Sequence, residues 1–162
     1  MTFWKRLYVW WKQILSQWSS DPLERCRWIK FPSTRQSRSD HPKDILARTG
    51  ENAAAQFLLS KGYTILHRNI RFPEGELDLV ISSGRTLVFV EVKTRSTEQF
   101  GLPYQSISEG KQRRQAAMAR RFVSLCRLQK FPVRFDVVFV ILPPGQLPKI
   151  EHIESAFLVN DL

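Results

Sequence analysis

The chain has 162 residues, 43% of them hydrophobic, which is enough for one domain of ordinary size with a real core and a modest extension. Its net charge of +10 favours polyanionic partners such as nucleic acid or anionic lipid. The two cysteines, Cys26 and Cys126, form no Cys-x-x-Cys pair and the histidines have no metal-ligand spacing, which argues against a disulfide framework or a zinc site and fits a reducing cytoplasm.

The N-terminal segment, residues 1–20, matches an amphipathic helix because Trp, Leu and Ile recur at helical spacing with Lys and Arg among them. Such a helix either lies on a membrane surface or packs on the main domain, and an unstructured leader is the third alternative; the pattern favours the last two. No apolar run approaches the ~20 residues that cross a bilayer, and no signal-peptide core is present, so we expect a cytoplasmic protein.

A polar segment separates this N-terminus from the main domain. Residues 19–44 are rich in Ser, Pro, Asp and Arg and lack periodicity, which predicts a linker. We place the domain boundary near Asp40, so that residues 1–40 form the Trp-rich helix and linker and residues 41–162 form the main domain.

The main domain begins with a helix and three strands. Apolar residues at helical spacing predict a helix from Lys43 to Lys61, and Gly62 is placed to end it in the left-handed conformation. Ser83-Gly84 supplies a tight turn between the second and third strand-like runs. The three runs cover residues 63–70, 76–82 and 86–94.

A second helix and further strands complete the domain. Ser106 and Glu109 form a capping-box pattern that predicts a long helix over about 107–130. A buried strand follows over 133–142, and residues 149–157 add a short edge strand. The order α-β-β-β-α-β predicts an α/β fold, a mixed sheet flanked by helices.

Acidic residues gather on two neighbouring strands. Because side chains two apart share a face of a strand, Glu76 and Asp78 point one way, while the other face carries Leu77, Leu79 and Ile81. Glu91 and Lys93 likewise share one face of the next strand.

The hairpin register decides which of these groups meet. If Ser82 pairs with Arg85, Glu91 lies opposite Glu76, and Asp78 lies opposite the aromatic ring of Phe89. Three carboxylates and one ammonium then converge on a single face, whereas a slip by one residue would separate them.

This convergence predicts a cation site. Like charges across a sheet repel, and one lysine is too little to neutralise three acids, so a hard divalent cation such as Mg²⁺ explains the cluster. The alternative is an exposed sheet face with solvated charges. It is disfavoured because the segments VFVEVK and FDVVFV are too apolar for an uncovered hairpin.

The same residues resemble known nucleases. Asp78, a gap of twelve residues and then Glu91-Val92-Lys93 resemble the PD-(D/E)xK signature of restriction-endonuclease-like nucleases. More specifically, residues 50–140 resemble the YraN family, bacterial proteins similar to Holliday-junction resolvases. The resemblance rests on GENAAAQFLLSKGY, RN, GELDLV, FVEVKTR, Lys111 and RFDVV, and it does not cover residues 1–40.

The resemblance implies a restriction-endonuclease-like core and a Mg²⁺-dependent phosphodiesterase, with Mn²⁺ as a substitute. Asp78 and Glu91 would hold the metal, helped by the Val92 carbonyl and by Glu51 or Glu76. Glu51 is the acid on the first helix that matches the family; without the resemblance it would be a helix-surface glutamate. Lys93 would orient or deprotonate the attacking water and stabilise charge on the phosphorus.

Basic residues on the second helix suggest where substrate would lie. Arg113 and Arg120 are seven apart and therefore share a face with Arg127, a stripe that either contacts phosphates or is simply solvated. Further candidate phosphate contacts are Lys111, which matches the family, Arg114 on the same helix, and Arg95 just after the Lys93 strand. Asp136 is either an outer partner of the site or, more commonly for a lone acid in a strand, a structural hydrogen-bonding group.

Three hypotheses remain open from the sequence. The first is a metal-dependent nuclease acting on DNA rather than RNA, on branched, nicked or single-stranded structures. The second is a nucleic-acid-binding module of the same fold without turnover of its own. The third makes residues 1–20 a membrane or partner anchor. Resolvase chemistry would require a symmetric dimer, but the sequence carries no clear dimerisation signal.

Overall fold

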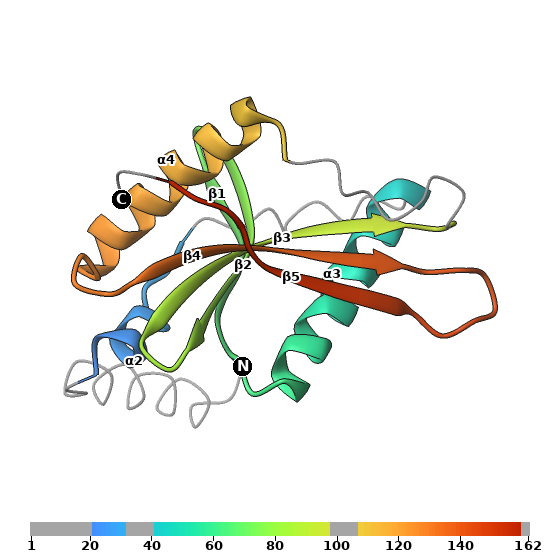
Figure 1. Ribbon diagram of the computed structural model, residues 1–162, viewed down its shortest axis with the longest axis horizontal. Coiled ribbons are helices and arrows are strands. Elements are labelled where there is room, and N and C mark those ends of the chain that lie inside the picture. The colour runs from blue at the N-terminus through green and yellow to red at the C-terminus, as the bar shows by residue number, and fades with distance from the viewer. Residues whose placement is uncertain (1–20, 32–40, 98–106, 160–162) are drawn as a thin grey trace, which may run out of the picture.

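The computed structural model describes residues 21–31, 41–97 and 107–159, so the helix expected over 1–20 and the cap expected at Ser106 lie outside it. Five strands form one mixed sheet in chain order, with helices on both faces (Figure 1). The expected α/β order with a mixed sheet is confirmed. The elements are α2 (Pro22–Cys26), α3 (Pro42–Ser60), β1 (Thr64–Phe72), β2 (Gly75–Ser83), β3 (Thr86–Arg95), α4 (Glu109–Cys126), β4 (Val133–Ile141) and β5 (Lys149–Phe157).

Helix α3 forms where the apolar stripe predicts it. The His41 ring caps its start by accepting a hydrogen bond from the Lys43 backbone N–H at 3.3 Å, and Gly62 follows its end at φ +86°. The helix packs closely on the sheet because Gly50 has no side chain where it meets Thr94 of β3. The face of the sheet under α3 is filled by one apolar cluster, whose members include Ala54, Leu58, Leu79, Val88 and Val138.

The opposite face lies under α4. Helix α4 connects β3 to β4, and these two strands pair in parallel, whereas the other neighbours are antiparallel. The helix begins at Glu109 rather than at about residue 107, and its N-cap residue, Ser108, makes no side-chain capping hydrogen bond. The helix ends at Cys126, where Arg127 takes a left-handed conformation at φ +55°. The second apolar cluster includes Phe89, Met118, Phe122 and Phe135.

The described part of the expected linker belongs to this second cluster. Leu23 and Cys26 of α2 are buried, and the Cys26 Sγ lies 2.8 Å from the Cys126 Sγ although the two residues are 100 apart in sequence. His67 fixes the segment further, since its Nε2 lies 2.8 Å from the Cys26 carbonyl oxygen. A linker over the whole of 19–44 is therefore wrong for residues 21–31, where apolar side chains reach the core. None of the described helices combines the length and apolar character that a bilayer crossing requires.

The register between β2 and β3 differs from the expected one by two residues. Ser83 pairs with Thr86 and Leu79 pairs with Val90, because the turn consists of Gly84-Arg85 rather than Ser83-Gly84. Gly84 has φ +56°, a conformation that suits glycine at the first central position of a hairpin turn. A shift of two residues preserves which face each side chain occupies, so Glu91 and Lys93 keep their predicted face.

The strict alternation expected along β2 is also wrong, because it breaks at Asp78. Leu77 packs in the cluster beneath α4, whereas Leu79 and Ile81 pack in the cluster beneath α3. In a regular strand Leu77 and Leu79 would lie on one face. The strand is therefore locally rotated at Asp78, the position on which the candidate site is built.

Candidate active site

Two carboxylates come together where β2 and β3 leave their regular pairing. Because Leu79 pairs with Val90, the next position along the two strands sets Asp78 beside Glu91. The Asp78 Oδ2 accepts a hydrogen bond from the Val92 backbone N–H at 2.8 Å. Both carboxylates line a pocket of about 310 Å³, together with residues of β2 and α4.

The electrostatics of this pair favour an added positive charge. Burial, reinforced by the negative charge of Glu91, raises the pKa of Asp78 to about 8, and the hydrogen bond from Val92 only partly opposes this shift. An ionised Asp78 is thus destabilised near neutral pH unless a cation lies close to it.

Glu91 is held by three donors from two elements. The Lys93 Nζ lies 3.1 Å from the Glu91 Oε1, and the Lys111 Nζ contacts the same oxygen. Gln115 of α4 donates from Nε2 to the Glu91 Oε2 at 2.8 Å. The buried Glu91 carboxylate is therefore satisfied by charge and by hydrogen bonds, which explains how it is tolerated on the inner face of a Val- and Phe-rich strand.

The pKa values of the two lysines that contact the Glu91 Oε1 are shifted by burial, by Glu91 and by each other. Burial lowers the pKa of Lys111, and the nearby Lys93 adds to this effect against the opposing pull of Glu91. Burial acts in the same direction on Lys93, but its contacts with Lys111 and Glu91 outweigh it and raise the pKa of Lys93. The two ammonium groups thus share one carboxylate oxygen, and each of them affects the pKa of the other.

The structure adds to what the sequence predicts for Lys111 and Gln115. Lys111 is predicted to contact a phosphate, and in the structure its ammonium faces Glu91 inside the pocket. Gln115 was not predicted, although it lies one residue before the apolar Ala116 on the side of the helix that faces the sheet and is almost fully buried. A polar residue within an apolar helix face was the available signal.

Two further acids, Glu76 of β2 and Glu51 of α3, belong to the surroundings of Asp78 and Glu91. Glu76 of β2 is half-buried and lines the same pocket. Glu51 lies on α3 and accepts a hydrogen bond from the Asn69 Nδ2 at 2.6 Å. Burial raises the pKa of Glu51, and the charge of Glu76 adds to it against the hydrogen bond from Asn69. The charge of Glu51 also contributes to the raised pKa of Asp78, so the acids interact.

The donor set fits a hydrated Mg²⁺ ion better than a fully protein-ligated one. Among the residues that the structure describes, no three His, Cys, Asp or Glu side chains form a ready-made metal cage. Mg²⁺ usually keeps several waters and takes only one or two protein carboxylates. Asp78 and Glu91 supply those two, and the pocket has room for waters and for a phosphate group.

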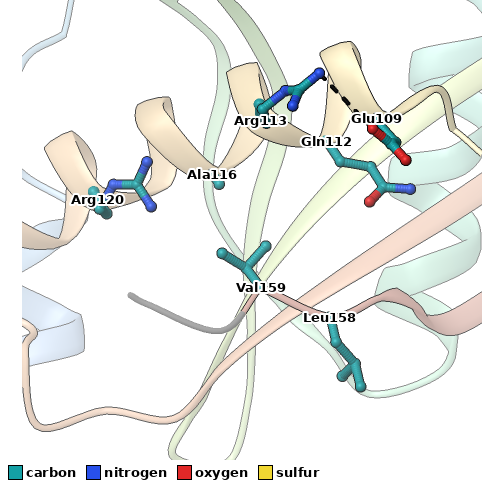
Figure 2. A pocket seen from close by; sticks show the side chains of 7 residues that line it. All are labelled: Glu109, Gln112, Arg113, Ala116, Arg120, Leu158 and Val159. Atoms are coloured by element: carbon teal, nitrogen blue, oxygen red, sulfur yellow. Dashed lines mark ion pairs between the residues drawn. The ribbon is translucent and has the colours of Figure 1, made fainter.

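The basic residues of α4 divide between two sides of the helix. Arg114 lines the carboxylate pocket. Arg113 and Arg120 share a face, as their spacing predicts, but they line a different cavity of about 370 Å³ beside Leu158 and Val159 (Figure 2). Arg113 also lies 3.9 Å from the Glu109 carboxylate.

Two further arginines were candidates for phosphate contacts, and neither lines the carboxylate pocket or the cavity beside Leu158. Arg127 follows the end of α4, because the helix ends at Cys126. Arg95 is exposed at the end of β3. The predicted stripe therefore does not continue into the carboxylate pocket.

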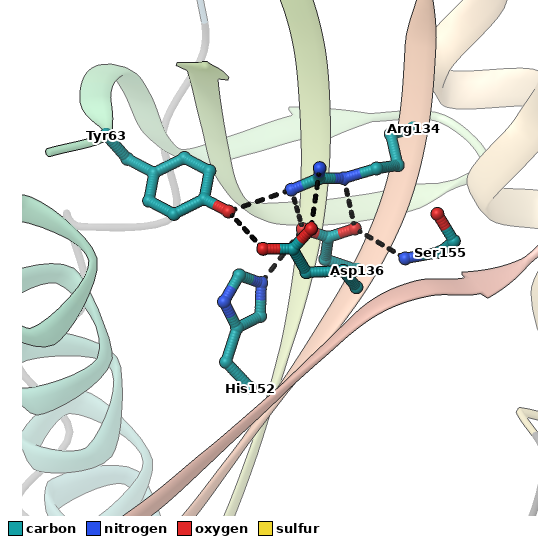
Figure 3. Close-up of polar contacts among 6 residues, drawn as sticks. Tyr63, Arg134, Asp136, His152 and Ser155 are labelled. Atoms are coloured by element: carbon teal, nitrogen blue, oxygen red, sulfur yellow. Dashed lines mark hydrogen bonds and ion pairs between the residues drawn. The ribbon is translucent and has the colours of Figure 1, made fainter. Parts of the chain in front are cut away.

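Asp136 lies in a separate buried network (Figure 3). Arg134 donates to both of its carboxylate oxygens at 2.8 and 2.7 Å, the His152 Nε2 lies 2.8 Å from its Oδ2, and the Ser155 N–H donates to its Oδ1 at 3.0 Å. Burial opposes ionisation, but the hydrogen bonds from His152 and Arg134 outweigh it and hold the pKa of Asp136 below its usual range. The network joins β4 to β5 and agrees with the structural interpretation of this residue.

Comparison with known proteins is consistent with this fold. The model of "Uncharacterised protein family UPF0102" matches residues 50–140, which include the C-terminal part of α3, all of β1 to β3, α4 and most of β4. A UPF0102 protein of Geotalea daltonii is 41% identical over 112 residues, 69% of this chain and 88% of the relative. One from Symbiobacterium thermophilum is 42% identical over 112 residues, 69% of this chain and 95% of the relative. The chain therefore belongs to UPF0102, the YraN family.

Proposed function

We propose that this protein is a metal-dependent nuclease that hydrolyses phosphodiester bonds in nucleic acid, with DNA as the favoured substrate. The observation that carries the proposal is the pairing of Asp78 with Glu91 in one pocket, with the Lys93 ammonium 3.1 Å from Glu91. A carboxylate pair can hold a divalent cation for phosphodiester hydrolysis, and an ammonium beside it can stabilise the charge that develops on the phosphoryl group.

The residues divide the work by their chemistry. Asp78 and Glu91 would hold the divalent cation, which when bound acidifies a water molecule and draws electron density from the phosphoryl oxygens. Lys93, whose ammonium lies 3.1 Å from Glu91, would donate a hydrogen bond to a phosphate oxygen as negative charge builds up on it. Gln115 fixes the Glu91 carboxylate from the side opposite the lysines by binding its second oxygen.

The charge distribution supports a polyanionic substrate. The chain carries a net charge of +10, and Arg114 lines the rim of the pocket that holds the two carboxylates. An exposed guanidinium at that rim is placed to contact a backbone phosphate next to the one being cleaved. Such contacts do not depend on base identity, so we expect preference for nucleic-acid structure rather than sequence.

A cleavage assay tests the proposal. Purified protein should cut labelled single-stranded, nicked and branched DNA in Mg²⁺ or Mn²⁺ and should be inactive in a chelator. Asp78→Asn, Glu91→Gln and Lys93→Met should each reduce the rate by about a hundredfold or more. Glu109→Gln, which changes an exposed acid on α4, is the control and should cut normally. Cleavage by the Asp78→Asn protein at the wild-type rate would refute this site.

A second candidate function rests on Lys111. Its ammonium contacts Glu91 directly, so an internal cation already neutralises part of the site. A nucleic-acid-binding module without turnover would be built in this way. Tight, salt-dependent DNA binding with no cleavage in either metal, and no change in binding on adding metal, would favour that function over the nuclease.

A further inference from the structure

Asn69 has an unusual backbone conformation at a position directly across from Asp78. On β1 its neighbours Arg68 and Ile70 pair with Leu79 and Leu77, which sets Asn69 opposite the residue between them. Its φ is +52°, a left-handed conformation that costs free energy for any residue with a side chain and that Asn tolerates better than most. Strain of this kind persists where the surrounding structure requires it.

The Asn69 side chain reaches across to another element. Its Nδ2 donates to the Glu51 Oε2 of α3 at 2.6 Å, and this is a contact between strand and helix rather than a local turn. Next to it, Arg68 donates to the Asn52 Oδ1 at 2.6 Å, so two consecutive strand residues hold two consecutive helix residues. Strand β1 is thereby joined to α3 by two hydrogen bonds, next to the position opposite Asp78.

These contacts set the place of Glu51. Helix α3 packs on the face of the sheet opposite to α4, and α4 supplies Lys111 and Gln115 to the site. Without a specific contact, a glutamate on α3 would turn its carboxylate to solvent. The amide of Asn69 instead keeps that carboxylate half-buried and binds it from the strand position opposite Asp78.

We propose that Asn69 is a positioning residue of the candidate cation site: its left-handed backbone and its amide hold Glu51 on the side of Asp78, so that a further carboxylate can accept hydrogen bonds from the waters of a bound ion. The proposal rests on the proposed function. It explains the residue type, because Gly would accept the backbone but has no donor, and Asp would add repulsion to an acidic cluster. Asn combines a low cost at positive φ with a short side chain that carries an N–H donor.

Mn²⁺ binding measured by calorimetry on the full chain tests this role. Asn69→Gly relieves the backbone strain and removes the donor, so the protein should keep or gain thermal stability while its Mn²⁺ affinity falls about fivefold to tenfold. Ser155→Gly is the matched control, because Ser155 also has φ +52° but lies in the Asp136 network. It should leave the Mn²⁺ affinity unchanged.

A double variant shows whether the effect acts through Glu51. In a Glu51→Gln background, Asn69→Gly should lower the Mn²⁺ affinity by less than twofold further. Equal Mn²⁺ affinity of the wild type and Asn69→Gly would overturn this inference alone. A wild-type protein that binds no Mn²⁺ would overturn the nuclease proposal and this role with it, so the two failures are distinguishable.

Discussion

Replacing Gly50 by alanine should weaken the packing of α3 on β3. A Cβ built at this position would lie 1.9 Å from the Thr94 Oγ1, 2.5 Å from its Cγ2 and 2.7 Å from its Cβ. Rotating the Thr94 side chain cannot remove the clash, because its Cβ is fixed to the backbone. The helix must therefore retreat from the sheet by roughly 1 Å to reach ordinary carbon–carbon contact.

The size of the effect follows from two opposing terms. Overpacking of this kind costs about 1–3 kcal/mol, while alanine is up to about 1 kcal/mol better than glycine inside a helix. We expect a net loss of about 1–2 kcal/mol, which for a chain of this size lowers the melting temperature by roughly 2–8 °C. Because Thr94 follows Lys93, the Mn²⁺ affinity should fall as well.

Thermal unfolding followed by circular dichroism measures this change. Gly110→Ala is the control, since the nearest atom to a Cβ there is the Arg114 Nη1 at 3.8 Å, and it should be neutral or stabilising. Adding Thr94→Ala to the Gly50→Ala protein should recover part of the loss. A Gly50→Ala protein as stable as the wild type would refute the close approach of α3 to β3.

Three further predictions concern buried ionisable groups. Asp136→Asn should lower the free energy of unfolding in urea by about 1–3 kcal/mol, because it removes the buried charge on which Arg134 and His152 converge and leaves Arg134 with Glu154 and Tyr63 as partners, whereas the exposed Glu154→Gln should cost less than about 1 kcal/mol. With a chelator present, the free energy of unfolding should fall as pH rises from about 4 to 8, because the folded state retains a proton on Asp78 that the unfolded chain releases. Asp78→Asn should make the free energy of unfolding depend less on pH. The same pH dependence in both proteins would contradict the raised pKa of Asp78. Contact with the Cys126 thiol, together with burial, raises the pKa of Cys26, so both thiols should react with a disulfide reagent about tenfold or more slowly than in urea, and equal rates would show that they are accessible.

The sequence predicts the elements of this fold well because their signals are local. Apolar spacing before Gly62 defines α3, and the Val- and Phe-rich runs define β3 and β4. The predicted face of Glu91 and Lys93 also holds, since parity along a strand survives a two-residue error in register.

Other features depend on contacts between distant segments. The true register depends on whether the turn uses Ser83-Gly84 or Gly84-Arg85, and both pairs contain the glycine that a tight turn needs. The break in alternation at Asp78 accompanies the left-handed Asn69 on the neighbouring strand, which no period-two pattern reveals. Lys111 was predicted to contact a phosphate because it matches the family pattern; its contact with Glu91 depends on how α4 packs on the sheet, which the sequence does not show.

Helix α2 has a consequence for how the protein can be divided. The family match begins at residue 50 and the polar segment suggests a cut near residue 41, yet Leu23 and Cys26 cover part of the main apolar cluster. A shortened protein starting at residue 41 would uncover Cys126 and the ring of Phe122, on which Phe31 stacks at 5.2 Å. This newly exposed apolar surface would promote self-association. Precipitation of the truncated protein would therefore indicate that the core had lost the cover of residues 21–31, and it would not indicate a defect in the carboxylate pocket.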